Sequence, residues 1–144
     1  MKPKAQPSRS DAKNKILIVD DNPQILELFS MLLRDAGFEV ERAEHALAAI
    51  AAVVNATPDI ILADIRMPIV DGLGLVHELK THADSRHIPV IAVTGYDSPE
   101  TREAARKAGY DGYITKPVDP RRFPAQIAAI LEKHRSGKKA KPAF

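Results

Sequence analysis

The sequence predicts an α/β fold in which helices cover both faces of a parallel β-sheet. Short apolar runs alternate along the chain with segments whose apolar residues recur at helical spacing. The run at residues 60–63 lacks the polar alternation of a half-exposed strand, and such a continuous apolar run is typical of a strand that is buried on both faces. Strict alternation of strands with helices favours parallel pairing and right-handed crossovers. We therefore expect five strand–helix units in one doubly wound sheet.

The composition fits one folded domain with a substantial core. The chain has 144 residues, of which 44% are hydrophobic and 28% are charged, and a chain of this size can bury a core of its own. It has no cysteine, which excludes disulfide bonds and thiolate metal sites. No secretory signal or membrane span is visible, since the first apolar run, residues 16–19, is too short for either. We expect a cytoplasmic protein that does not bind a membrane.

The formal net charge of +2 is distributed unevenly along the chain. Residues 1–15 carry five Lys or Arg and one Asp, and residues 132–144 carry five Lys or Arg and one Glu, so each end has a charge of +4. The segment between them therefore carries +2 less +8, or −6. We expect flexible basic tails at 1–14 and 135–144 around a folded domain at 15–134. Basic tails can touch nucleic acid or acidic lipid. These lack interleaved aromatic residues, so we favour solubilising extensions and expect no direct contact with nucleic acid.

Five mostly apolar runs are expected to form the strands. They cover residues 16–19, 38–40, 60–63, 89–93 and 111–115. The third run is followed by Asp64, and a charge is costly to bury inside a sheet. Asp64 is therefore expected where the strand emerges, at the carboxyl edge at which open α/β sheets bind ligands. Taken alone, Asp64 could equally well cap the following turn.

Start and stop signals place a helix after each strand. The first helix has an Asx cap followed by Pro23 and stops at Gly37. The third helix opens at Asp71, and the fourth is capped by Ser98 and ends at Gly109. In the second helix we expect one apolar face, formed by Ala46, Leu47, Ile50, Val53 and Val54.

Two of the expected helices are unusual. The fourth has only alanines as apolar residues, so it offers little large apolar area to bury and is expected to dock weakly. The last helix is expected to open at Asp119 and Pro120, with Pro124 beyond its first turn. A proline at that position loses a backbone hydrogen bond, so the helix either begins late or has an irregular first turn. Its apolar face is expected to contain Phe123, Ile127, Ile130 and Leu131.

Polar side chains follow four of the five expected strands. Asp20 and Asp21 follow the first strand, and Asp64 follows the third. Thr94 and Lys116 follow the fourth and the fifth. Because the carboxyl ends of parallel strands meet at one edge, these side chains should gather there. Three carboxylates so close together would raise one another's pKa unless a cation were present, and Mg²⁺ suits a site with few carboxylates. A carboxylate nucleophile beside Mg²⁺, a lysine and a hydroxyl donor is typical of phosphoryl transfer onto an aspartate.

Each of these residues also has a plain structural interpretation. Asp21 could help to cap the first helix, Thr94 could belong to a turn, and Lys116 could be an ordinary surface lysine. These interpretations do not explain why all the residues fall at the same edge of the sheet. The combination therefore favours a functional site.

The same residues stand in motifs that follow one another in a fixed order. The pair Asp20 and Asp21 follows Ile-Leu-Ile-Val, and Asp64 is followed by Ile-Arg-Met-Pro-Ile-Val-Asp-Gly. Thr94 precedes Gly95, and Tyr-Ile-Thr-Lys-Pro occupies residues 113–117. Over roughly residues 14–134 the sequence resembles the receiver domain of two-component response regulators. The resemblance implies a flavodoxin-like (βα)5 sheet with strand order 2-1-3-4-5.

The resemblance also implies a phosphoacceptor and a metal site. Asp64 would accept a phosphoryl group from a phosphohistidine on a sensor histidine kinase or a histidine phosphotransfer protein. Mg²⁺ would be held by Asp20, Asp21, Asp64 and the backbone carbonyl of Arg66. Arg66 and Tyr96 fall where the family tunes how long the phosphoryl group lasts.

The remaining implied roles concern phosphoryl binding and switching. Thr94, Gly95 and Lys116 would bind the phosphoryl group, and the Lys116–Pro117 bond is a candidate cis peptide that would aim the lysine into the site. Thr94 and Tyr113 would form the switch, with Tyr113 turning inward as Thr94 moves toward the phosphoryl group. The alternative for Tyr113 is a half-buried strand residue whose hydroxyl reaches solvent.

The expected function is that of a stand-alone response regulator. Only about a dozen residues follow the last expected helix, too few to fold as an output domain. Phosphorylation would switch a surface that docks a downstream protein, formed by the helix at 98–108, the fifth strand and the last helix. Such a protein catalyses only its own phosphorylation and dephosphorylation, so we do not expect an enzyme. Both a monomer and a phosphorylation-dependent dimer are consistent with the sequence.

Two other classes of protein fit the sequence less well. A receiver-like interaction module that works without phosphorylation would be expected to lose the acidic pair, the acceptor or the lysine, and this sequence keeps all of them. An FMN electron carrier on the same fold would need a phosphate-binding loop after the first strand. Asp20 and Asp21 lie there instead and would repel the phosphate.

Overall fold

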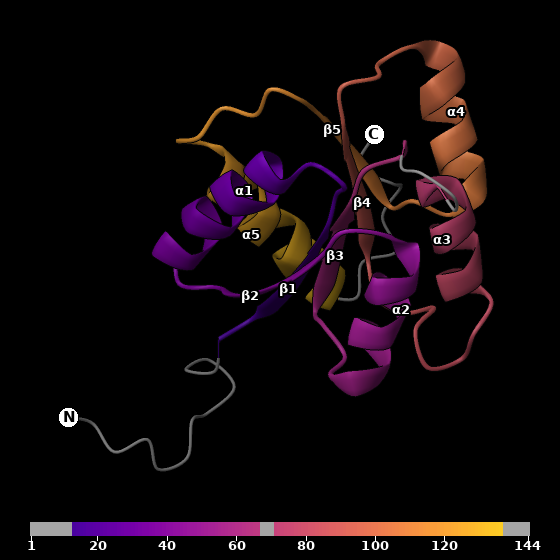
Figure 1. Ribbon diagram of the computed structural model, residues 1–144, viewed down its shortest axis with the longest axis horizontal. Coiled ribbons are helices and arrows are strands. Elements are labelled where there is room, and N and C mark those ends of the chain that lie inside the picture. Colours follow the sequence, from indigo (N-terminus) through magenta and orange to yellow (C-terminus); the bar gives the residue numbers. More distant parts are fainter. Residues whose placement is uncertain (1–12, 67–70, 137–144) are drawn as a thin grey trace.

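The computed structural model describes residues 13–66 and 71–136 and shows a five-stranded parallel sheet between two layers of helices (Figure 1). The strands are β1 Lys15–Val19, β2 Glu39–Ala43, β3 Ile60–Ala63, β4 Val90–Thr94 and β5 Gly112–Thr115. The helices are α1 Pro23–Asp35, α2 Ala46–Asn55, α3 Gly72–Lys80, α4 Pro99–Ala108 and α5 Phe123–Arg135. The strand order β2-β1-β3-β4-β5 confirms the predicted flavodoxin-like topology.

Both faces of the sheet are buried, which explains the continuous apolar runs of the strands. On β1, Ile16 and Ile18 pack under α1 and α5, whereas Leu17 and Val19 face the layer formed by α2, α3 and α4. Figure 1 shows these two layers on opposite sides of the sheet. Alternate residues of one strand therefore serve two cores, so neither face can accept a charge within the strand.

The second strand is longer than the sequence predicted. We expected it at residues 38–40, and β2 covers Glu39–Ala43. It lies at the edge of the sheet, where Val40 and Ala43 are buried and Glu39 and Arg42 are exposed. An apolar run is a poor marker for a strand with solvent on one side, because polar residues are tolerated there.

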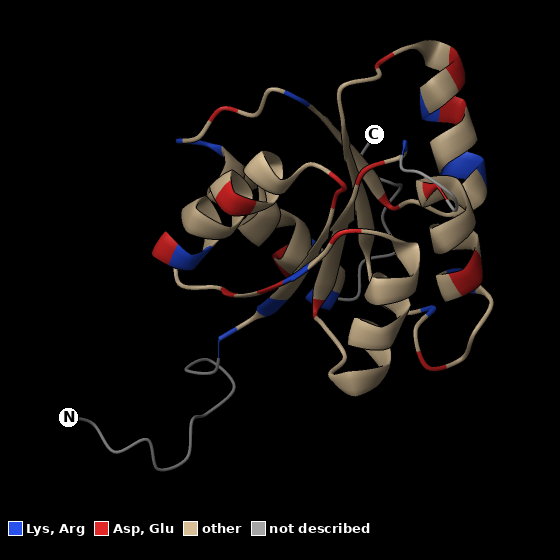
Figure 2. Ribbon diagram, in the orientation of Figure 1, with Lys and Arg blue, Asp and Glu red and all other residues tan. Residues whose placement is uncertain are grey.

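The predicted apolar face of α2 was wrong at two of its five positions. The side chains of Leu47 and Val54 are 68% and 78% exposed. The buried positions of the helix are Ala46, Ala49, Ala52 and Val53. Figure 2 shows no charged residue anywhere on α2. An uncharged apolar helix has no polar side to mark its outer face, so periodicity could not identify which side packs on the sheet.

The two helices that the sequence marked as unusual are unusual in the structure. Only Ala105 of α4 is buried, which fits a weakly docked helix. The last helix begins late, at Phe123, and Pro124 lies in its first turn, where the missing N–H is tolerated. Phe123 is fully buried and its ring centroid lies 4.8 Å from that of Phe29 on α1. The late start therefore places the largest side chain of α5 in the core.

The two ends of the chain and one internal segment lie outside this description. Residues 1–12 and 137–144, which make up most of the two expected tails, are among the positions not described, and so are residues 67–70. No helix in the described ranges combines the length and the apolar character that crossing a bilayer requires.

Candidate functional site

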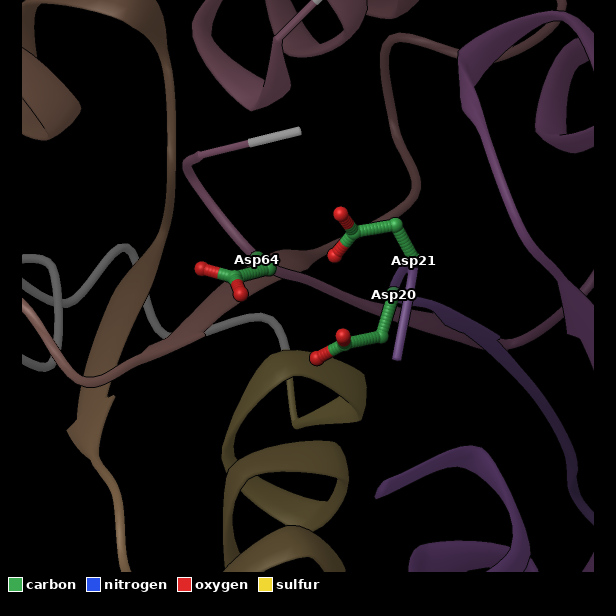
Figure 3. Close-up of side chains that lie close together, drawn as sticks. All are labelled: Asp20, Asp21 and Asp64. Carbon is green, nitrogen blue, oxygen red and sulfur yellow. The ribbon is translucent and has the colours of Figure 1, made fainter. Parts of the chain in front are cut away.

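Three carboxylates meet at the carboxyl edge of the sheet, where β1 and β3 end (Figure 3). Asp20 and Asp21 follow β1, and Asp64 follows the adjacent β3. One carboxylate oxygen of each residue lies within 4.8 Å of the others. Asp20 and Asp64 are buried and Asp21 is exposed. Solvent therefore reaches the cluster on the side of Asp21, whereas the carboxylates of Asp20 and Asp64 are covered by the protein.

Backbone hydrogen bonds continue past the strand ends and fix the two buried carboxylates. The Asp20 N–H donates to the carbonyl of Ala43 at 3.1 Å, and the Asp64 N–H donates to the carbonyl of Val19 at 3.1 Å. The Asp20 carboxylate also accepts a hydrogen bond from the N–H of Asn22 at 2.9 Å. Parallel pairing therefore positions both side chains before any ligand contributes.

The structure assigns the helix cap to Asn22 and not to Asp21. The Asn22 side chain accepts hydrogen bonds from the N–H groups of Gln24 and Ile25, at 2.8 and 3.3 Å. Asp21 makes no cap contact to α1. The capping interpretation of Asp21 is therefore wrong, and its carboxylate is free to serve the cluster.

Lys116 brings a positive charge to the two buried carboxylates from the end of β5. Its Nζ lies 2.8 Å from Asp20 Oδ2 and 3.1 Å from Asp64 Oδ2. Its N–H donates to the carbonyl of Thr94 at 2.9 Å, which ties the lysine backbone to β4. The Lys116–Pro117 peptide bond is cis.

Burial and charge oppose each other in this group. Burial raises the pKa of Asp20, and the hydrogen bonds from Lys116 and Asn22 offset only part of that rise. For Lys116, burial disfavours the ammonium, but the hydrogen bond to Asp20 and the charge of Asp64 outweigh it and raise the pKa of the lysine. The ammonium of Lys116 therefore stays charged at neutral pH. The ionised form of Asp20 is only partly stabilised by its present partners, so a further cation beside it would be favourable.

Thr94 and Gly95 form the neighbouring wall of the site. Thr94 is fully buried at the end of β4, and its hydroxyl oxygen accepts a hydrogen bond from the N–H of Tyr96 at 3.2 Å. Gly95 is exposed, and no heavy atom lies within 4 Å of the position where a Cβ would stand. Arg66 lies at the rim, with its guanidinium carbon 4.2 Å from the centre of the Tyr96 ring. The Arg66 N–H also donates to Asp64 Oδ1 at 3.4 Å.

Tyr113 is turned inward, between β5 and the loop that leads to α4. Its side chain is buried and its hydroxyl donates to the carbonyl of Tyr96. The guanidinium of Arg102 on α4 lies 4.5 Å from the centre of the Tyr113 ring and is bonded to Asp97 at 2.7 Å. The interpretation of Tyr113 as a strand residue with a solvated hydroxyl is therefore wrong. Tyr96 therefore links the two switch candidates through hydrogen bonds: its N–H donates to Thr94, and its carbonyl accepts from Tyr113.

Sequence reasoning missed a second tyrosine at this site. Tyr110 is 1% exposed, and its hydroxyl donates to the backbone carbonyl of Asp64 at 3.3 Å. Nothing in the local sequence marks it, because an aromatic residue just before a strand is an ordinary core residue.

Comparison with known proteins shows the family to which this chain belongs. The family model described as the response regulator receiver domain matches residues 16–128. The chain belongs to the response regulator receiver family. It is 38% identical over 116 residues to the polar-differentiation response regulator DivK of Brucella anthropi, an alignment that covers 81% of this chain and 94% of that protein.

Solved structures show the same receiver fold. A CheY-like response regulator receiver domain protein from Methanospirillum hungatei has a TM-score of 0.80 and 33% identity, covering 88% of this chain and 99% of that chain. The chemotaxis protein CheY4 of Vibrio cholerae has a TM-score of 0.79 and 30% identity, covering 83% of this chain and 99% of that chain. The protein is thus a CheY-like receiver of two-component signalling, with an acidic cluster that fits the phosphoacceptor site of such a domain.

Proposed function

We propose that this receiver accepts a phosphoryl group on Asp64 from a phosphohistidine donor and passes the signal on through a protein-docking surface. One observation carries the proposal: three carboxylates converge within 4.8 Å of one another, and Lys116 bonds to both buried members. A structural ion pair needs only one carboxylate. Three acidic groups around one ammonium leave negative charge uncompensated, which suits a site that takes a second cation and a phosphoryl group.

The donor set fits Mg²⁺. Carboxylate oxygens are hard ligands of the kind Mg²⁺ prefers, and the exposed side of the cluster leaves room for water. We propose that Asp20, Asp21 and Asp64 hold the ion together with the backbone carbonyl of Arg66. When bound, Mg²⁺ neutralises charge on the phosphoryl oxygens.

The side chains of the protein supply the remaining parts of the reaction. A carboxylate oxygen of Asp64 attacks phosphorus, the bond from phosphorus to the histidine nitrogen breaks, and the electron pair of that bond stays on the imidazole. The Lys116 ammonium already contacts Asp64, so after the transfer it can donate a hydrogen bond to a phosphoryl oxygen and offset its negative charge. Thr94 supplies a hydroxyl donor, and Gly95 keeps the adjacent wall free of side-chain bulk.

We propose that Thr94 and Tyr113 carry the signal away from Asp64. The Thr94 hydroxyl now accepts from the N–H of Tyr96, and the carbonyl of Tyr96 accepts from Tyr113. If the Thr94 hydroxyl turned to bond the phosphoryl group, the N–H of Tyr96 would lose its hydrogen-bond acceptor. The backbone at Tyr96 could then move, and its carbonyl would move relative to the Tyr113 hydroxyl that it now accepts from. The adjoining helix α4 buries only Ala105, so it can shift at low cost. The surface of α4, β5 and α5 is our proposed contact for the downstream protein.

Other parts of this proposal follow from the family. The donor would be a sensor histidine kinase or a histidine phosphotransfer protein, in the cytoplasm, and the protein would catalyse only its own phosphorylation and dephosphorylation. It would act as a monomer or as a phosphorylation-dependent dimer.

The proposal is tested by incubating the protein with acetyl phosphate and measuring its intact mass. We expect one added phosphoryl group when Mg²⁺ is present and none in EDTA. Asp64→Asn should add none, whereas Asp59→Asn, at the other end of β3, should add one as the wild type does. If neither acetyl phosphate nor beryllofluoride changes the mass, the amide exchange or the Tyr113 environment of the wild type, the protein is instead an interaction module that works without phosphorylation.

A further inference from the structure

Tyr110 places a phenol hydroxyl beside residues 64–66, the described segment that follows β3 and that we call the acceptor loop. The residue lies between α4 and β5, and its N–H donates to the carbonyl of Ala105 at 3.1 Å. Its side chain is 1% exposed and belongs to the core that also contains residues of α2, α3 and α4, and its hydroxyl donates to the backbone carbonyl of Asp64 at 3.3 Å. The backbone of the proposed phosphoacceptor is thus bonded to a side chain that starts 46 residues later in the chain.

The contact is held from three sides, with no spare room. A Cβ placed on Gly72, the first residue of α3, would lie 2.1 Å from the Asp64 carbonyl oxygen and 2.2 Å from the Tyr110 hydroxyl. It would also lie 2.8 Å from the Cα of Ile65. The Gly72 N–H donates to the carbonyl of Ile65 at 2.7 Å. Acceptor loop, helix start and phenol therefore meet at one close-packed point, so that none of them can shift alone.

The environment keeps the phenol in its donor form. Burial holds the pKa of Tyr110 well above its usual range, and the charges of Asp64 and Asp71 act in the same direction. Near neutral pH the hydroxyl carries its proton, as tyrosine hydroxyls ordinarily do, and can donate to the Asp64 carbonyl. A buried carbonyl oxygen without such a donor loses a partner that water cannot easily replace.

We propose that Tyr110 is a positioning residue for the Asp64 acceptor. The hydroxyl fixes the plane of the Asp64–Ile65 peptide, and this plane sets the direction in which the Asp64 side chain leaves the backbone. The proposal rests on the proposed function of Asp64 and adds a second connection between the acceptor and α4. This connection runs from Asp64 through Tyr110 to Ala105, independently of the Thr94 and Tyr113 pair.

The test compares Tyr110→Phe with Ser85→Ala. Phenylalanine keeps the ring in place and removes only the hydroxyl. Ser85 is a matched control, because its buried hydroxyl also donates to a backbone carbonyl, that of Leu79 at 2.7 Å, but at the opposite end of α3. We expect Tyr110→Phe to slow phosphorylation by acetyl phosphate roughly tenfold, since small errors in the placement of a reacting group are costly. The ¹³C resonance of the Asp64 carbonyl should move in this variant, while Ser85→Ala should leave both the rate and the resonance unchanged.

The outcomes separate the positioning role from the proposed function. A Tyr110→Phe rate within twofold of the wild-type rate would overturn the positioning role, and so would equal slowing by both variants. If neither acetyl phosphate nor beryllofluoride acts on the wild type, the proposed function fails, and the positioning role of the Tyr110 hydroxyl is then tested by Mg²⁺ affinity. A several-fold weaker affinity in Tyr110→Phe alone would then support positioning of the Asp64 carboxylate, and an unchanged affinity would overturn it.

Discussion

The Gly72→Ala variant is expected to lose about 3 kcal/mol of its free energy of unfolding, because forced overpacking of a dense core costs that order of energy. The added methyl group would lie 2.1 Å from the carbonyl oxygen of Asp64, which is backbone and cannot turn aside as a long side chain would. Relief requires α3 or the acceptor loop to move. Phosphorylation of Asp64 should therefore fall together with stability. Urea unfolding measures the first effect and intact mass the second.

Gly95→Ala is the matched control for this prediction. Gly95 lies at the same edge of the sheet, but no heavy atom lies within 4 Å of its added Cβ. Its free energy of unfolding should stay within about 0.5 kcal/mol of the wild-type value, as for most surface substitutions. Equal urea midpoints for Gly72→Ala and the wild type would show that the acceptor loop is softer than the structure indicates.

Mg²⁺ is expected to stabilise the folded protein by about 2.7 kcal/mol at a concentration one hundred times its dissociation constant. The reason is that the ion binds the converged carboxylates of the folded state, which the unfolded chain does not hold together. Asp20→Asn should lose most of this gain. Glu78→Gln, which removes an exposed carboxylate on α3, should keep all of it. Thermal unfolding with and without Mg²⁺ measures the effect, and an equal shift in all three proteins would mean that the ion binds elsewhere.

The same carboxylate predicts a pH dependence in the absence of metal. The pKa of Asp20 is raised by folding above its ordinary value of 3.8. A carboxyl group of this kind contributes its full stability below the unfolded pKa, and the contribution is lost as pH rises through the folded pKa. In EDTA, the wild type should therefore lose more stability than Asp20→Asn as the pH rises from about 4. Urea unfolding across this pH range tests the sign, and parallel curves for the two proteins would contradict it.

The positions of the site residues could be predicted because topology fixes them. In a parallel sheet, every residue at the carboxyl end of a strand lies at the same edge, so Asp20, Asp64, Thr94 and Lys116 could be placed together without side-chain information. The strand order could be predicted only through the resemblance to receiver domains. Alternation of strands and helices is shared by other doubly wound sheets and does not determine it.

The features that sequence reasoning missed depend on side chains that meet across elements. The Tyr110 hydroxyl bonds a carbonyl 46 residues earlier in the chain, and no local pattern records such a contact. The outer face of α2 was misassigned because Leu47 and Val54 are as apolar as the residues beneath them. Tyr113 on β5 is covered by Arg102 of α4 and bonded to the carbonyl of Tyr96, which lies between β4 and α4, so its burial could not be predicted from the residues around it in the sequence.

We expect Asp64, and no other carboxylate of the cluster, to receive the phosphoryl group. Borohydride reduces an acyl phosphate to an alcohol and leaves free carboxylates unchanged, so a phosphorylated aspartate becomes homoserine. The measurement is peptide mass spectrometry after incubation with acetyl phosphate and Mg²⁺ and reduction in this way. We expect homoserine at position 64 and unmodified aspartate at Asp20 and Asp21. Homoserine at either of those two positions, with Asp64 intact, would contradict the assignment of the acceptor.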